Sequence, residues 1–148
     1  MDRLFFIASA QAMERSMYCI ARSYLRCEAD CEDALQNALL RAWEKRNTLR
    51  EERYFRLTRI LINSCKETLR RQKREAPTAD FPEAAAPQGS DPVLWEALRA
   101  LDEKYRVTVI LHYRDGYSVR EIASILRVPE STVKTRLSRA RQQLKSIL

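Results

Sequence analysis

Residues 116–148 read GYSVREIASILRVPESTVKTRLSRARQQLKSIL, and this stretch decides the fold of the C-terminal part of the chain. Ser118 and Glu121 have the spacing of a capping box, in which the two side chains bond free amides at the start of a helix. Pro129 suits the start of a second helix, because a proline in the first turn forfeits no intrahelical hydrogen bond. Two helices joined by this tight turn predict a helix-turn-helix. The first helix would bury the apolar residues Ile122, Ala123, Ile125 and Leu126.

The final helix has two faces with different chemistry. At about 100° per residue, one side collects the apolar residues Val133, Leu137, Ala140 and Leu144. The opposite side collects Ser131, Thr135, Ser138, Arg139 and Gln142, with Lys134 and Arg141 along one edge and Arg136 along the other. A helix in the major groove needs short polar groups and an arginine towards the bases, and cations towards the phosphates. These eight residues are therefore candidate DNA-binding residues; the alternative is a solvated amphipathic helix with ordinary surface charge.

Composition narrows the class of protein. The 148 residues hold 27 Lys+Arg against 20 Asp+Glu, a net charge of +7, so nucleic acid is the first partner to consider. Two glycines and five prolines favour helices over a turn-rich sheet, and we predict an all-α fold. No window holds the roughly 20 apolar residues that cross a bilayer, and the apolar run at 4–7 is too short for a signal peptide. We therefore expect a cytoplasmic protein without direct membrane insertion.

Charge divides the chain into three parts. Residues 1–74 hold 16 basic and 10 acidic side chains, and residues 92–148 hold 11 and 6. Between them, EAPTADFPEAAAPQGSD (75–91) has four acidic side chains, no basic one, three prolines and a glycine. Such a segment is typical of an extended linker. We predict two small helical domains, 1–74 and 92–148, joined by a flexible linker over 75–91.

Apolar residues at helical spacing predict three helices in the first domain and two further helices before the helix-turn-helix. In the first domain the three stripes are Met13, Met17, Ile20, Ala21, Tyr24 and Leu25; Ala34, Leu35, Ala38, Leu39, Ala42 and Trp43; and Tyr54, Leu57, Ile60, Leu61, Cys65 and Leu69. In the second domain they are Val93, Leu94, Ala97, Leu98 and Leu101, then Tyr105, Val109, Ile110 and Tyr113.

The third helix of the first domain is strongly basic. Residues 53–74 hold eight Lys/Arg against the single acid Glu67, with Tyr54 and Phe55 at the start and Asn63 in the middle. Cations beside aromatic and amide groups can hold a single strand and its bases. The alternative is a solvated helix face. Upstream, acidic residues at 28–33 lie where a helix N-terminus favours them, and they suit a protein-facing surface better than DNA.

The sequence gives little support to metal binding or catalysis. The chain has four cysteines and a single histidine, which is a poor supply of metal ligands. We therefore expect reduced thiols and no bound metal or cofactor. An enzyme such as a nuclease would need metal-binding carboxylates or a histidine-based site. The acidic pairs 51–52 and 102–103 look instead like loop or helix-start charges. We predict no enzyme activity.

Three strings in order resemble the extracytoplasmic-function (ECF) group of bacterial RNA polymerase sigma factors. They are ADCEDALQNALLRAWEKRNTL (29–49), YFRLTRILINSCKETLRRQKR (54–74) and the stretch from ALRALDEKYR to the end (97–148). Related activators share the pattern of the last string but lack the first two. The alternative, a stand-alone helix-turn-helix regulator, would need a dimerisation device, and none is apparent.

The resemblance implies three contact surfaces. Core RNA polymerase would be bound by Asp33, Gln36, Asn37 and Trp43. The −10 element of promoter DNA would be held by the loop 47–53 and by Asn63, Lys66, Arg70 and Arg71. The final helix would read the −35 element through Thr135, Ser138 and Arg139, the face chosen above from chemistry alone. The resemblance further implies an anti-sigma factor as partner, which in this group is often membrane-anchored.

Two positions depart from the usual pattern of the group. Arg56 stands where a tryptophan is usual, which replaces an aromatic side chain by a charge. Arg127 stands at the usual turn glycine, so either its backbone is left-handed at a modest cost or the turn differs from the usual one.

Overall fold

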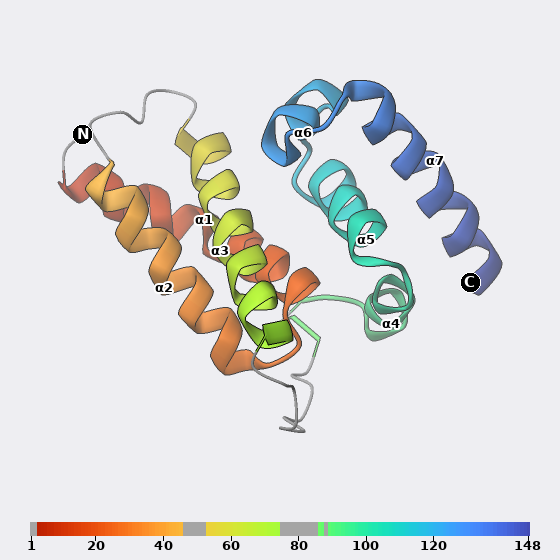
Figure 1. The fold of residues 1–148 in the computed structure, drawn as a ribbon, viewed down its shortest axis with the longest axis horizontal. Coiled ribbons are helices and arrows are strands. Elements are labelled where there is room, and N and C mark those ends of the chain that lie inside the picture. Colours follow the sequence, from red (N-terminus) through yellow and green to blue (C-terminus); the bar gives the residue numbers. More distant parts are fainter. Residues whose placement is uncertain (1–2, 46–52, 75–85, 88) are drawn as a thin grey trace. The chain divides into compact units, whose positions relative to one another are not determined.

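The computed structural model describes residues 3–45, 53–74, 86–87 and 89–148, and the secondary structure in those ranges is helical throughout, with no strand. The prediction of an all-α fold is confirmed. The chain divides into two compact units, Met1–Ala84 and Ala85–Leu148, coloured red to green and green to blue in Figure 1. Most of the predicted linker (75–85 and 88) and the predicted −10 loop up to residue 52 lie outside the described residues.

The N-terminal unit is a bundle of three helices that pack pairwise. They are α1 (Arg3–Tyr24), α2 (Glu28–Glu44) and α3 (Arg53–Arg74). The predicted stripes form its core, with α2 contributing alanines so that its backbone lies close to its neighbours. Leu35, Leu39, Trp43, Ile60 and Leu69 are only half-buried, and the side chain of Tyr54 lies outside the described ones. The buried members are Met13, Met17, Ile20, Ala21, Tyr24, Leu25, Ala34, Ala38, Ala42, Leu57, Leu61 and Cys65.

Each unit contains a buried arginine that satisfies carbonyl groups at the end of a helix. In the N-terminal unit, Nη1 of Arg22 donates to the carbonyl oxygens of Leu25 and Arg26, both at 3.1 Å. In the C-terminal unit, Nε and Nη2 of Arg106 donate to the carbonyls of Leu98 (3.1 Å) and Leu101 (2.8 Å). The last carbonyls of a helix have no intrahelical partner, so both arginines stabilise the chain where one helix gives way to the next.

The C-terminal unit consists of α4 (Pro92–Ala100), α5 (Glu103–Val109), the π-helical turn η2 (Ile110–Arg114), α6 (Val119–Leu126) and α7 (Glu130–Ile147). The continuation of α5 as a π-helix was not predicted. Three residues placed in apolar stripes are exposed instead, namely Val93, Leu94 and Tyr113. In α4 the predicted Ala97 and Leu98 are buried, but Trp95 is buried in place of Val93 and Leu94.

The predicted helix-turn-helix is present as α6 and α7. The amide of Glu121 donates to Oγ of Ser118 (3.1 Å) and the amide of Ser118 donates to the Glu121 carboxylate (3.0 Å), which confirms the capping box. Arg127 ends α6 with a left-handed backbone (φ 57°, ψ 49°), the first of the two alternatives for this turn. Pro129 lies one residue before the first residue of α7, and its carbonyl accepts from the amide of Val133.

The described residues hold neither a membrane-spanning helix nor a metal-binding cluster. In those ranges, none of the helices combines the length and apolar character of a membrane-spanning segment. The same part of the chain has no group of three or more His, Cys, Asp or Glu side chains arranged to hold a metal ion.

Candidate nucleic-acid and protein-binding surfaces

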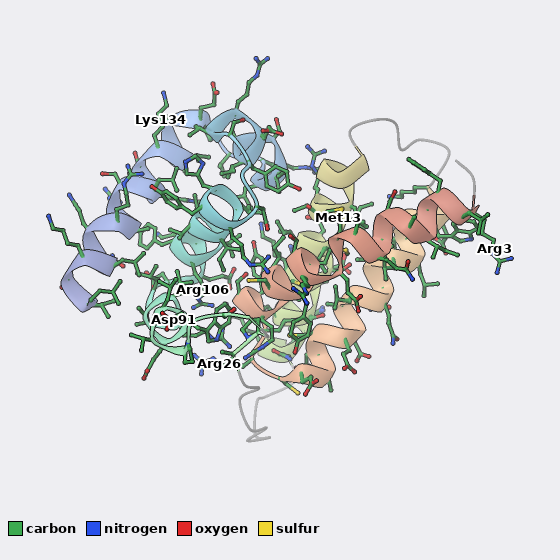
Figure 2. The ribbon with its side chains drawn as sticks, turned by 180° about the vertical axis from the view of Figure 1, so that it is seen from behind. Arg3, Met13, Arg26, Asp91, Arg106 and Lys134 are labelled. Atoms are coloured by element: carbon green, nitrogen blue, oxygen red, sulfur yellow. The ribbon has the colours of Figure 1, made fainter. Side chains whose placement is uncertain are left out.

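The exposed face of α7 carries the candidate DNA-binding residues of the helix-turn-helix. Val133, Leu137 and Ala140 are buried against the unit, and Leu144 is half-buried. Figure 2 shows Lys134 projecting from α7 into solvent. Arg136 is half-buried. The fold thus leaves a polar and cationic surface free to meet a partner, and its exposed members are Ser131, Lys134, Thr135, Ser138, Arg139, Arg141 and Gln142.

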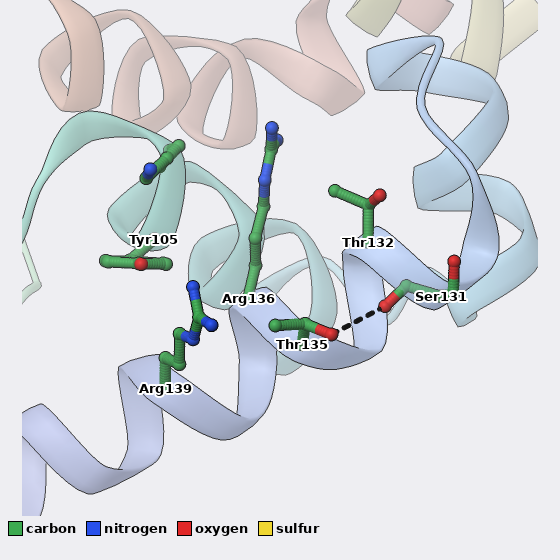
Figure 3. A pocket seen from close by; sticks show the side chains of 7 residues that line it. Tyr105, Ser131, Thr132, Thr135, Arg136 and Arg139 are labelled. Carbon is green, nitrogen blue, oxygen red and sulfur yellow. Dashed lines mark hydrogen bonds between the residues drawn. The ribbon is translucent and has the colours of Figure 1, made fainter.

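Two polar side chains on this face have local partners. Nη1 of Arg141 donates to the hydroxyl of Tyr113, at 2.7 Å, which connects α7 to the π-helical turn η2. The hydroxyl of Thr135 donates to the carbonyl of Ser131 one turn earlier, at 3.0 Å (Figure 3). The first contact fixes one arginine at an edge of α7, and the second leaves the oxygen of Thr135 able to accept.

The basic face of α3 carries the four residues expected to bind the −10 element. Asn63, Arg70 and Arg71 are exposed and Lys66 is half-buried. Asn63, Lys66 and Arg70 follow at spacings of three and four, so they share one side of the helix. The side chains of residues 53–56, including the unusual Arg56, lie outside the described ones.

The single acid of α3 is held by a neighbouring helix. Nη2 of Arg41 lies 2.9 Å from Oε2 of Glu67 and Nη1 lies 3.3 Å from Oε1, a two-pronged ion pair between α2 and α3. The hydrogen bonds from Arg41 lower the pKa of Glu67 below its usual value, and the carboxylate raises the pKa of Arg41. The negative charge of Glu67 is thereby neutralised by Arg41, so it repels the phosphates of a nucleic-acid strand less.

The face of α2 expected to bind polymerase is exposed along its length. Asp33, Gln36 and Asn37 are exposed, and Leu40, which follows them on the same side, is 61% exposed. Trp43 is half-buried and meets Phe6 of α1 edge to face, with ring centroids 5.1 Å apart. The tryptophan is thus part of both the surface and the packing of α1 on α2.

An apolar groove adjoins this face. It has a volume of about 470 Å³ and lies between the first turns of α1 and the second half of α2. Exposed apolar groups line it, among them Ile7 and Leu40, and single domains expose few such clusters, so the groove is a candidate binding surface. Sequence reasoning missed Phe6, Ile7 and Leu40. Leu40 lies three residues after Asn37, so helical spacing was a signal that placed an apolar side chain on the polar face.

Comparisons with known proteins show which family the chain is similar to. Residues 10–75 match Sigma-70 region 2, and residues 93–144 match Sigma-70, region 4. The chain is 34% identical over 154 residues to the ECF RNA polymerase sigma factor SigM of Mycobacterium tuberculosis, a match that covers 99% of this chain and 79% of that protein. It is 33% identical over 136 residues to the RNA polymerase sigma-E factor of Streptomyces coelicolor, covering 86% and 77%.

A solved structure has the same fold over nearly the whole chain. It is the sigma factor RpoE of Bartonella quintana in complex with the anti-sigma factor NepR, with a TM-score of 0.77, 26% identity and coverage of 93% of this chain and 94% of that one. Region 2 coincides with the three-helix unit, and region 4 with the unit that contains the helix-turn-helix. The chain belongs to the sigma-70 family and is an RNA polymerase sigma factor of the ECF group.

Proposed function

We propose that this sigma factor binds core RNA polymerase through the exposed face of α2 and directs it to promoters. The observation that carries the proposal is the row formed by Asp33, Gln36, Asn37 and Leu40, which is polar at its start and apolar at its end and adjoins an apolar groove. Protein interfaces combine a small apolar centre with a polar rim in this way. Acidic side chains there disfavour DNA as the partner of this face.

The basic face of α3 would hold the −10 element once the strands separate. Asn63 offers an amide that can pair with a displaced base, while Lys66, Arg70 and Arg71 can neutralise the strand that carries it. The ion pair between Arg41 and Glu67 supports this assignment, because it neutralises the one acidic side chain of α3.

The exposed face of α7 would read the −35 element in the major groove. Thr135, Ser138 and Arg139 would face the bases, and Lys134, Arg136 and Arg141 the phosphates. Ser131 and Gln142 extend the polar face at either end. The two domains 1–74 and 92–148, joined over 75–91, would then contact promoter elements that lie apart on the DNA.

We further propose that the protein has no catalysis of its own, because the polymerase supplies the chemistry. It would act in the cytoplasm, where the chromosome and the polymerase are. An anti-sigma factor as regulator is supported by the Bartonella quintana relative, which was crystallised with one. The alternative, a stand-alone helix-turn-helix regulator, leaves the match to Sigma-70 region 2 unexplained.

Reconstitution with core polymerase tests the proposal. The full chain should co-elute with core enzyme on gel filtration and yield run-off transcripts from genomic fragments, whereas core enzyme alone should not initiate specifically. Gln36→Ala should weaken co-elution. The exposed α1 residue Gln11 does not line the groove, so Gln11→Ala is the matched control and should behave as wild type. Operator binding without any association with polymerase would instead favour the regulator.

A further inference from the structure

A cationic pocket lies between the start of α5 and the first half of α7. Its volume is about 280 Å³, against about 30 Å³ for one water molecule in the liquid. Lys104 and Tyr105 line it from α5, and Arg136 and Arg139 line it from α7. Figure 3 shows Arg136 and Arg139 extending from α7 towards the side on which Tyr105 lies. Three cations therefore converge on one space, although only two of them belong to the helix that reads DNA.

The lining favours a phosphate group. None of the lining residues is acidic, and besides Tyr105 three of them carry hydroxyl groups, namely Ser131, Thr132 and Thr135. Lysine, arginine and hydroxyl side chains are the usual partners of phosphate oxygens. Within the described part of the chain, Lys104, Arg136 and Arg139 form no ion pair. Their charge is thus available to an anion from outside.

Tyr105 supports the lysine at the mouth of the pocket. The ring is 7% exposed, so it belongs to the core of the unit, and Nζ of Lys104 lies 5.2 Å from its centroid. An ammonium over an aromatic face is attracted to the ring, which limits the positions that a long side chain samples. The ring thus helps to keep Lys104 in the lining of the pocket.

We propose that this pocket binds a backbone phosphate of the −35 duplex, with Lys104 as a phosphate-contacting residue outside the helix-turn-helix. The inference rests on the proposed insertion of α7 into the major groove. A helix with its side chains is about 10–12 Å wide and the groove about 12 Å, so the phosphates of both strands pass close to the helix edges. The pocket lies along one such edge of α7, and its lining includes the proposed base-facing residues Thr135 and Arg139.

A salt titration of DNA binding tests the proposal. Binding of the full chain to a random-sequence duplex is measured by fluorescence anisotropy at several salt concentrations. Because each neutralised phosphate contributes about 0.9 to the slope of log K against log salt, Lys104→Ala should lower the slope by about that amount. Lys104→Arg should keep it. Lys145→Ala is the matched control, since it removes the same charge from an exposed position near the end of α7, and its slope should equal that of wild type.

A double variant tests whether the two helices share one phosphate. If Lys104 and Arg136 contact the same group, Lys104→Ala with Arg136→Ala should lower the slope by about one phosphate rather than two. A loss of two would contradict a shared pocket. Equal slopes for Lys104→Ala and Lys145→Ala, with circular dichroism showing both folded, would overturn the proposal altogether.

Inorganic phosphate tests whether the pocket binds free phosphate or a phosphate of the DNA backbone. At constant ionic strength it should change the thermal unfolding of wild type and Lys104→Ala equally. A rise in Tm that depends on Lys104, without a change in the DNA slope, would assign the pocket to free phosphate and contradict the inference. Co-elution with core polymerase should be unaffected by Lys104→Ala, so failure of the pocket and failure of the sigma-factor proposal give different results.

Discussion

Arg141 of α7 donates a 2.7 Å hydrogen bond to the hydroxyl of Tyr113, which lies in the π-helical turn η2. Both side chains are exposed. The bond holds the guanidinium at one edge of α7 before any DNA is present, and a fixed side chain loses less conformational entropy when it binds. The unpredicted π-helix thus positions a residue that the sequence had assigned to phosphate contact.

Tyr113→Phe should therefore weaken DNA binding through Arg141. Freeing one long side chain costs about 0.5–1 kcal/mol on binding, which is about two- to fivefold in Kd. The loss should be equal on every DNA sequence and should vanish in an Arg141→Ala background. Anisotropy titrations of the four proteins in this cycle measure it. If Tyr113→Phe weakens DNA binding as much in the Arg141→Ala background as in wild type, Tyr113 contacts DNA itself.

Arg139 and Arg141 should differ in what they contribute. Arg139→Ala should cost about 1–3 kcal/mol on the cognate −35 sequence and much less on a scrambled one, because a bidentate base contact carries sequence information. Arg141→Ala should weaken both sequences alike and reduce the salt slope by about one. Competition binding with cognate and scrambled duplexes distinguishes the two. Equal losses for Arg139→Ala on both sequences would rule out its place at the bases.

The helix-turn-helix was the part of the fold most readily predicted. Its capping box, turn and buried stripe are local, so the spacing of Ser118, Glu121 and Val133 was sufficient to find them. The exposure of Tyr113 and the burial of Trp95 in place of Val93 and Leu94 were not predictable in this way. Both depend on how the helices pack against one another, which the spacing within one helix does not determine.

Arg127→Gly should stabilise the C-terminal unit. A left-handed backbone costs an L-residue about 1–2 kcal/mol, while glycine adds about 0.5–1 kcal/mol of chain entropy to the unfolded state. The net expectation is a gain of up to about 1.5 kcal/mol in the free energy of unfolding. Urea denaturation followed by Trp95 fluorescence, in a Trp43→Phe background, checks it. Arg127→Ala removes the same charge but keeps the Cβ atom, so it should give no gain; equal gains would attribute the effect to charge.

The ion pair of Arg41 and Glu67 should make the stability of the N-terminal unit depend on pH. The pKa of Glu67 is lower in the folded protein, so its contribution is present above the unfolded pKa and is lost as the pH falls through the folded pKa. The side chains are 43% and 52% exposed, which limits the contribution to about 0.3–1 kcal/mol. Urea unfolding should show this difference between wild type and Glu67→Gln at about pH 7 and lose it progressively as the pH falls below the usual range of a carboxyl pKa. A difference that stays constant over that range would contradict the assignment.

The candidate sites were predicted unevenly. Asp33, Gln36 and Asn37 came from the resemblance, and their exposure on one side of α2 agrees with it. Phe6 and Lys104 could not have been found from the sequence, since each matters through a helix distant in the chain. Phe6 contacts Trp43 of α2, and Lys104 lines a pocket with Arg136 of α7. Only packing brings these pairs together.

Permanganate reactivity of thymines in the −10 element tests the central claim most directly. Separating stacked base pairs costs about 1.4 kcal/mol per step, which one small helical unit cannot repay alone. Polymerase bound through α2 would supply further contacts and raise the effective concentration of both DNA-binding units. We predict reactive thymines with core polymerase and wild-type or Gln11→Ala protein, none with the free protein, and a loss with Gln36→Ala that follows its lost polymerase binding. Strand opening by the free protein, or full opening by a Gln36→Ala protein that no longer binds polymerase, would contradict the account.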